Sequence, residues 1–205
     1  MKKLLFLVAA AVAAAGSLSA AWTYDATEGT ITDNVWTFGA TVNGTELTVN
    51  AVQIAPSEVS PLDFSQSVTD VDGTSYTIVK LDPQFGSRAA TWGNPEDFVG
   101  TPEGAKVGAL ALPASGLTEI SNCAFAFCSN ATGVVSLSSD LVKIGNAAFD
   151  HCDGITGFNP LVPDSVTSIG DFAFAYTAPA QDVSLKNVAT ITYGLFTGTP
   201  ITSVY

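Results

Sequence analysis

The second half of the chain repeats one spacing of apolar residues four times. Each copy has an aliphatic residue, two variable residues, Ile, four variable residues and Phe, and successive Ile positions lie 24, 25 and 22 residues apart. A unit of this length cannot bury its apolar edge alone, so the copies are expected to stack into a solenoid of about four to five coils. The predicted core comprises Leu117, Ile120, Phe125, Leu141, Ile144, Phe149, Val166, Ile169, Phe174, Val188, Ile191 and Phe196.

Alternation before each copy predicts a strand that precedes it in every coil. In the stretch from Val107 to Leu112, Leu110 and Leu112 are expected to point inward and the alanines between them outward. Outward side chains of successive coils would lie about 5 Å apart and form a continuous ribbon. The predicted binding residues on this ribbon are Ala109, Ala111, Val134, Ser136, Asp182 and Ser184.

Residues 22–85 show a different pattern, with apolar and polar residues alternating at period two and no repeat. Asn43-Gly44 separates two such runs, and Asp72-Gly73 separates another two. These dipeptides favour tight hairpin turns, type I′ for Asn-Gly, so we expect a small antiparallel sheet that caps the first coil. Leu81 and Phe85 resemble a repeat that is one residue short.

Residues 86–106 are rich in Gly and Pro and are predicted to be an inserted loop. The expected organisation is therefore a leader at 1–21, a β-rich cap at 22–85, the loop at 86–106 and the repeats at 107–205. The fold class is mainly β.

Extended backward and forward, the repeat resembles that of a known family. Its best-matched pieces are Ser165-Val166-Thr167-Ser168-Ile169-Gly170 with Ala173-Phe174, and Ile144-Gly145 with Ala148-Phe149 and Cys152. These resemble the BspA-type leucine-rich repeats of bacterial and protist surface proteins. The resemblance implies a non-enzymatic role in adhesion or in binding extracellular macromolecules.

The first 21 residues are typical of a secretory signal peptide. Met1-Lys2-Lys3 precedes a short apolar run from Leu4 to Ala15, and small residues follow up to Ala21. The run is shorter than the roughly 20 residues of a membrane span. Cleavage is expected after Ala21, with Ser19 as the second candidate, and the product is expected to be secreted or surface-located without a transmembrane segment.

Charge and side-chain chemistry exclude several classes of function. The chain carries a formal net charge of −12, whereas nucleic-acid binding depends on Lys and Arg contacts with phosphates. The single histidine, His151, adjoins Cys152 on a predicted turn, where the two side chains cannot easily converge on one substrate atom. We therefore expect no enzymatic activity, no metal site and no cofactor.

The three cysteines leave two alternatives open. Cys128 and Cys152 share one repeat position, so they are either buried thiols or a disulfide between adjacent coils. Cys123 lies outside this position and is the expected unpaired thiol.

Three functions remain at this stage. The first is binding of an extracellular protein or glycan through the ribbon. The second is a carbohydrate-binding module in which Trp22, Trp36 and Trp92 stack against sugar rings. The third is a structural envelope component that self-associates through its C-terminal coil.

Overall fold

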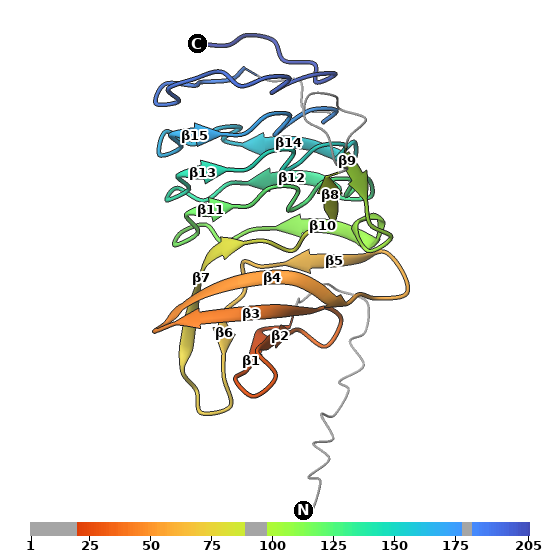
Figure 1. Ribbon diagram of the computed structural model, residues 1–205, viewed down its shortest axis with the longest axis vertical. Helices are drawn as coiled ribbons and strands as arrows, with labels where there is room; N and C mark the ends of the chain where they lie inside the picture. Colours follow the sequence, from red (N-terminus) through yellow and green to blue (C-terminus); the bar gives the residue numbers. More distant parts are fainter. Residues whose placement is uncertain (1–19, 89–97, 178–181) are drawn as a thin grey trace, which may run out of the picture.

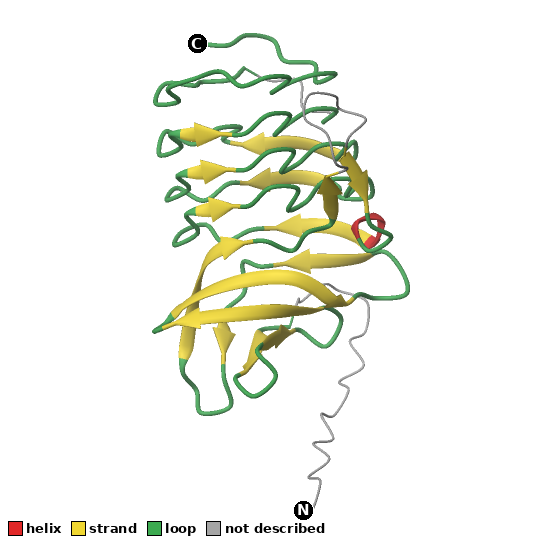
Figure 2. Ribbon diagram, in the orientation of Figure 1, coloured by secondary structure: helices red, strands yellow, loops and turns green. Residues whose placement is uncertain are grey.

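The computed structural model describes residues 20–88, 98–177 and 182–205. It is built mainly from β-strands and connecting turns, and the described chain contains one short 3-10 helix, η2 (Gly104–Lys106) (Figure 2). Nowhere in these ranges does a helix have the length and apolar character needed to cross a bilayer. The predicted signal peptide lies almost entirely outside the described residues.

The N-terminal strands close into a ring. Six strands follow one another in the order β7-β4-β3-β2-β1-β6, and β6 also pairs with β7. Closure removes the open strand edges at this end. The strands are β1 (Trp22–Asp25), β2 (Thr30–Thr32), β3 (Thr37–Asn43), β4 (Glu46–Ile54), β6 (Val68–Thr69) and β7 (Ser75–Leu81).

The prediction of an antiparallel sheet is right for part of this ring and wrong for the rest. The pairs β1–β2, β2–β3, β3–β4 and β6–β7 are antiparallel, whereas β1–β6 and β4–β7 are parallel. The first predicted hairpin is present, but its turn differs. Asn43 pairs with Glu46, so Gly44 and Thr45 are the central residues, and of these only Gly44 has positive φ. One positive φ at the first central position fits a type II′ turn rather than the predicted type I′.

Two of the three tryptophans form the core of the ring. Trp22 and Trp36 are fully buried, and the Trp22 ring stacks on Phe64 with centroids 5.2 Å apart. Their indole N–H groups donate to the backbone carbonyls of Asp63 and Pro61. The suggestion that these two rings stack against sugars is therefore wrong. Trp92 lies outside the described residues.

Beyond the ring the chain winds into stacked coils (Figure 1). Each coil has a short strand on one side. The short strands of successive coils pair in parallel, so that Leu81, Ile120, Ile144 and Ile169 lie in register. The opposite side carries the longer strands. The first ladder comprises β7, β11 (Glu119–Ile120), β13 (Lys143–Ile144) and β15 (Ser168–Ile169), and the second comprises the pairs of β5 (Ser60–Asp63) with β10 (Val107–Ala111) and β12 (Gly133–Ser136) with β14 (Ile155–Asn159).

The predicted cap already contributes a coil to both ladders. β5 pairs in parallel with β10, Leu81 pairs with Ile120, and the Phe85 ring lies 6.2 Å from that of Phe125. The short repeat suggested by Leu81 and Phe85 is thus present. The predicted loop at 86–106 also contains regular structure, since β8 (Gly86–Arg88) and β9 (Phe98–Gly100) form an antiparallel pair.

A column of phenylalanine rings runs through the coils. Ring centroids of Phe125 and Phe149 are 5.4 Å apart, those of Phe149 and Phe174 are 5.6 Å apart, and those of Phe174 and Phe196 are 5.9 Å apart. Most of the predicted core residues are buried as expected, and Val188 and Phe196 are half-buried against the same core.

Ile191 is the exception, because 70% of its surface is exposed. Its segment forms no strand with β15. The interval between Ile169 and Ile191 is the shortest between successive repeats. Ile191 also lies in the last full coil of the described chain, so no later coil of that part covers it. The prediction that Ile191 is a core residue is therefore wrong.

The Gly that follows Ile in the repeat is required by close packing between coils. The amide N–H of Asn146 donates to Oδ1 of Asn122, and that of Asp171 donates to Oδ1 of Asn146. This ladder brings the backbone of each coil against the next. A Cβ on Gly145 would lie 2.5 Å from the carbonyl carbon of Ser121.

We expect Gly145→Ala to lower the free energy of unfolding by about 1–3 kcal/mol, because backbone atoms must move to admit the methyl group. Urea unfolding followed by circular dichroism measures the loss. Val142→Ala, at an exposed position of the same coil, is the control and should change stability by less than about 0.5 kcal/mol. Equal effects of the two substitutions would contradict the packing argument.

Candidate interaction surfaces

The predicted ribbon lies on the outer face of the long strands. Val134 is level with Gly157 and Ser136 with Asn159, in parallel register. Ala109 bridges to Thr132, two residues before Val134. Five of the predicted binding residues, Ala109, Val134, Ser136, Asp182 and Ser184, are exposed, and Ala111 is half-buried.

Asp182 has a partner within the chain. Its carboxylate accepts hydrogen bonds from the hydroxyls of Thr202, Ser203 and Tyr205, with 2.7 Å from Oδ1 to the Ser203 hydroxyl and 2.7 Å from Oδ2 to that of Tyr205. These bonds lower the pKa of Asp182 to about 2. The same segment pairs with the backbone of Val183. Asp182 therefore holds the C-terminal segment in place, a role that alternation along the strand did not predict.

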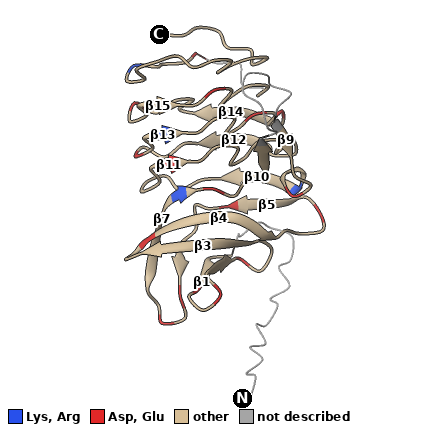
Figure 3. Cartoon of the chain, in the orientation of Figure 1, with Lys and Arg blue, Asp and Glu red and all other residues tan. Residues whose placement is uncertain are grey.

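The opposite face carries a row of charges on the short strands (Figure 3). Lys80 and Lys143 both contact Oε1 of Glu119, at 3.1 and 3.2 Å. Burial raises the pKa of Glu119, but the hydrogen bonds and charges of the two lysines outweigh it, and the pKa lies below its usual value. This row links three neighbouring coils across the sheet.

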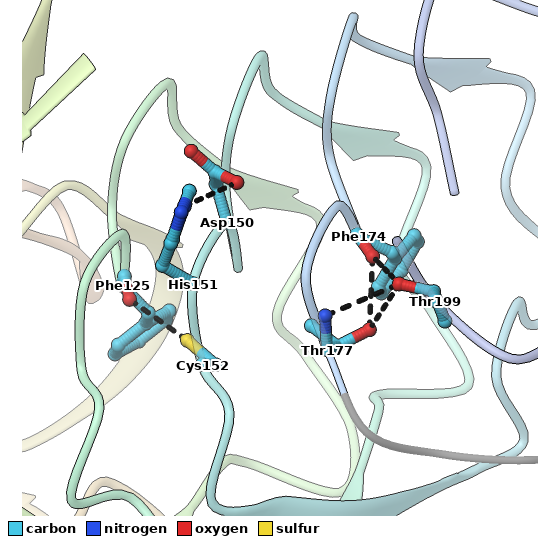
Figure 4. Close-up of polar contacts among 7 residues, drawn as sticks. All are labelled: Phe125, Asp150, His151, Cys152, Phe174, Thr177 and Thr199. Atoms are coloured by element: carbon cyan, nitrogen blue, oxygen red, sulfur yellow. Dashed lines mark hydrogen bonds and ion pairs between the residues drawn. The ribbon is translucent and has the colours of Figure 1, made fainter. Parts of the chain in front are cut away.

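The repeat position three residues after Phe is a hydrogen-bond donor in the second, third and fourth coils. The Cys152 thiol donates to the carbonyl oxygen of Phe125 at 3.0 Å, and the hydroxyls of Thr177 and Thr199 donate to that of Phe174 (Figure 4). Cys and Thr can both occupy this position because each can donate to a Phe carbonyl, that of the preceding coil for Cys152 and Thr199 and that of its own coil for Thr177.

The three cysteines are buried thiols, and none forms a disulfide. Of the two alternatives for Cys128 and Cys152, the structure therefore contains the thiol pair. Burial raises the pKa of the Cys128 thiol well above its usual value. Cys123 is also buried.

A second ring column lies outside the main core, and sequence reasoning missed it. His151 is stacked between Phe127 and Tyr176, with ring centroids 4.7 and 4.4 Å apart. All three residues stand two positions after a core Phe. This offset was the signal available in the sequence. The His151 side chain is one-third exposed, so it is only partly the solvent-facing turn residue that the motif suggested.

His151 is paired with a buried carboxylate. Its Nδ1 lies 2.9 Å from Oδ1 of Asp150, while Oδ2 of Asp150 is buried without a partner in the described chain. Burial raises the pKa of Asp150 to about 6, although His151 opposes the shift. In Figure 4 the Cys152 thiol bonds the Phe125 carbonyl while His151 faces Asp150, so the histidine and the thiol do not converge.

The described ranges contain no group of three or more His, Cys, Asp or Glu side chains placed to hold a metal ion. Charged and ring-stacked groups instead serve contacts between coils. Besides the exposed long-strand face, the described residues form a hollow of about 440 Å³ beside the short strands and a second of about 300 Å³, which is lined by Asp153, Tyr176, Thr177, Gly198 and Pro200.

Comparison with protein families identifies the repeats. Residues 104–205 match the family model described as BspA type leucine-rich repeat region (6 copies). The repeats at 104–205 therefore belong to the BspA-type leucine-rich repeat family.

Solved structures include two similar chains. A leucine-rich repeat protein from Bacteroides ovatus is 21% identical and superposes with a TM-score of 0.59, over 83% of this chain and 39% of that one. The pneumococcal vaccine antigen PcpA is 18% identical with a TM-score of 0.46, over 86% of this chain and 49% of that one. This chain thus spans less than half of either relative. No curated protein matches it.

Proposed function

We propose that this protein is a non-enzymatic interaction protein of the cell exterior that binds a macromolecule through the outward face of its long strands. The observation that supports this proposal most is the ribbon itself. Ala109, Val134, Ser136 and Ser184 are exposed on three of the coils, and 60% of the Val134 surface is accessible. Such small side chains offer a flat surface on which a partner can lie close to the backbone.

Membership of the family supports a surface role. Export is proposed from the leader pattern, and Trp22, which follows the proposed cleavage site, is the first residue of β1 and is fully buried. Ala20 and Ala21 are exposed. Cleavage after Ala21 would therefore leave every strand of the ring intact.

The architecture proposed for this role is a solenoid closed at one end. The ring of six strands would serve as the N-terminal cap, because it leaves no free strand edge at that end. The ribbon extends along the coils that follow the ring. Adhesion to extracellular proteins or glycans is the form of binding that this shape favours.

Self-association is a second candidate, and the open end favours it. Ile191, Tyr193 and Tyr205 are exposed on the final coils. The backbone amides of Gly194, Phe196 and Gly198 have no backbone hydrogen-bond acceptor in the described chain. In the earlier coils, the amides at the same repeat positions donate hydrogen bonds to carbonyls of the next coil. Light scattering over a range of concentrations distinguishes this function from ribbon binding.

The proposed site can be tested by adding negative charge to the ribbon. Val134→Glu combined with Ser136→Glu adds two carboxylates to the ribbon, and we expect it to abolish capture by immobilised extracellular-matrix proteins or glycans in biolayer interferometry. Contacts by such small side chains give weak single-site affinity, so wild-type protein clustered on streptavidin should bind far better than monomer.

Val142→Glu combined with Thr167→Glu is the matched control, because both residues are exposed on the opposite sheet. It should leave capture unchanged, and circular dichroism should show that both variants fold. If the ribbon variant captures as well as wild type, the binding site lies elsewhere.

A further inference from the structure

Two of the buried thiols occupy the same repeat position in neighbouring coils. Cys128 follows Phe125 by three residues, and Cys152 follows Phe149 by three. The amide N–H of each cysteine donates to the carbonyl oxygen of the phenylalanine in its own coil, at 3.2 and 3.3 Å. The two turns are also joined directly, because the amide of Phe125 donates to the carbonyl of Ala148. The two cysteines therefore stack in equivalent turns.

Side chains at this repeat position touch between coils. Burial raises the pKa of the Cys128 thiol, and a hydrogen bond with the Cys152 side chain raises it further. In a later pair of coils, the hydroxyl oxygens of Thr177 and Thr199 lie 3.1 Å apart at the same position. Hydrogen-bonded neighbouring backbones lie about 4.8 Å apart, and a disulfide accepts Cα separations of about 4.4–6.8 Å. The stacking of the coils thus suits a bond between these two sulfurs.

Loss of the two thiol protons would leave no buried carbonyl without a partner. In the reduced protein the Cys152 thiol donates to the carbonyl oxygen of Phe125 at 3.0 Å. The same oxygen accepts the amide N–H of Cys128, so it keeps one hydrogen bond when the thiol no longer donates. An unsatisfied buried group is the main cost of removing a buried hydrogen bond, and that cost does not arise here.

We propose that Cys128 and Cys152 form a disulfide between adjacent coils when the exported chain meets a disulfide oxidant. One cysteine thiolate attacks the oxidant, forms a mixed disulfide with it and releases one thiolate. The second cysteine thiolate attacks the first Sγ, so the Sγ–Sγ bond forms and a second thiolate leaves. The two cysteine protons pass to the released thiolates, and the oxidant is reduced to two thiols. Because both cysteines are fully buried, this exchange takes place while the coils assemble or open.

The third cysteine takes no part in this bond. Cys123 packs in a separate cluster with Ala126, Ala147, Phe172 and Ala175, whereas the other two cysteines belong to the main core. The proposed bond joins positions 24 residues apart in the sequence. It would restrict the unfolded chain and raise the melting temperature by roughly 5–10 °C.

Refolding under two redox conditions tests the proposal. The full chain is refolded from urea at pH 8, either with oxidised and reduced glutathione or with a phosphine reductant. It is then denatured, alkylated with iodoacetamide and analysed by intact-mass spectrometry. Of the three cysteines, we expect one to be alkylated after glutathione and all three after the reductant. Trypsin cleaves after Lys143, between the two bonded cysteines, so non-reducing peptide mapping detects the linked peptides.

Two variants make the assignment specific. Cys123→Ala should still form the bond and take up no label after glutathione. Cys152→Thr introduces the residue that stands at this position in the next coil, Thr177. It should take up two labels and melt at the same temperature under both conditions. The proposal is wrong if wild type takes up three labels after glutathione, if the bond includes Cys123, if glutathione stays attached to the chain, or if the bond lowers the melting temperature.

Discussion

Phe149→Ala is expected to lower the free energy of unfolding by about 3–5 kcal/mol. Phe149 is fully buried, and its ring packs between those of Phe125 and Phe174 and against the edge of Phe158 at 5.0 Å. Alanine would leave a cavity that coils on both sides border. Since each coil is held by its neighbours, relaxation into this cavity is restricted.

Urea unfolding monitored by circular dichroism provides the measurement. Val134→Ala, which shortens a largely exposed side chain, is the control and should cost less than about 0.5 kcal/mol. A loss of similar size for Phe149→Ala would mean that the rings do not hold the coils together. Such a result would overturn the column as the source of stability.

The repeat could be predicted because its core positions are local and regular. Ile120, Ile144 and Ile169 occupy one ladder, as their spacing indicated. The spacing of a repeat alone does not reveal whether another coil packs on each side of it. Ile191 has the same local pattern but no covering coil, and exposure follows from that difference.

The N-terminal ring could be predicted only in part. Hairpins such as β3–β4 join strands that are adjacent in sequence, so turn residues indicate them. The parallel pairs β4–β7 and β5–β10 join distant segments, and no local signal specifies such partners. The closure of β6 onto β7 and the contribution of β5 to the coils depend on these long-range pairs.

The candidate surfaces could likewise be predicted only in part. Alternation correctly placed Val134 and Ser136 on the outside of a strand. It did not show that Asp182 binds the C-terminal segment, because that segment is some twenty residues away. Nor did it show that Asp150 is buried, since Asp at the surface of a turn is the common case.

Asp150 occupies a repeat position that is alanine in the coils on either side, Ala126 and Ala175. All three residues are fully buried. A carboxylate there has one partner, His151, and one oxygen with none in the described chain. Ionised Asp150 is therefore destabilising, and its pKa of about 6 expresses this cost, because burial disfavours the charged form.

The sign of the pH dependence follows from this pKa. Unfolded Asp150 would titrate near 3.8, so the folded state binds more protons between about pH 4 and 6. Its contribution to stability falls as pH rises through this window, and the full penalty applies above it. Glu119 and Asp182 have lowered pKa values and oppose this trend in the wild type. The contribution of Asp150 thus appears in the difference between wild type and a neutral variant.

We expect Asp150→Asn to raise the free energy of unfolding at pH 8 by about 2–3 kcal/mol, the cost that corresponds to the pKa shift. The gain should shrink as pH falls and vanish only below about pH 3, where wild-type Asp150 is protonated in both the folded and the unfolded state. Urea unfolding of both proteins at several pH values measures it. Asp153→Asn, which neutralises an exposed carboxylate nearby, should produce no comparable gain. If Asp150→Asn destabilises the protein at pH 8, the hydrogen bond with His151 outweighs the cost of burial, and Asp150 is a stabilising residue of the coil.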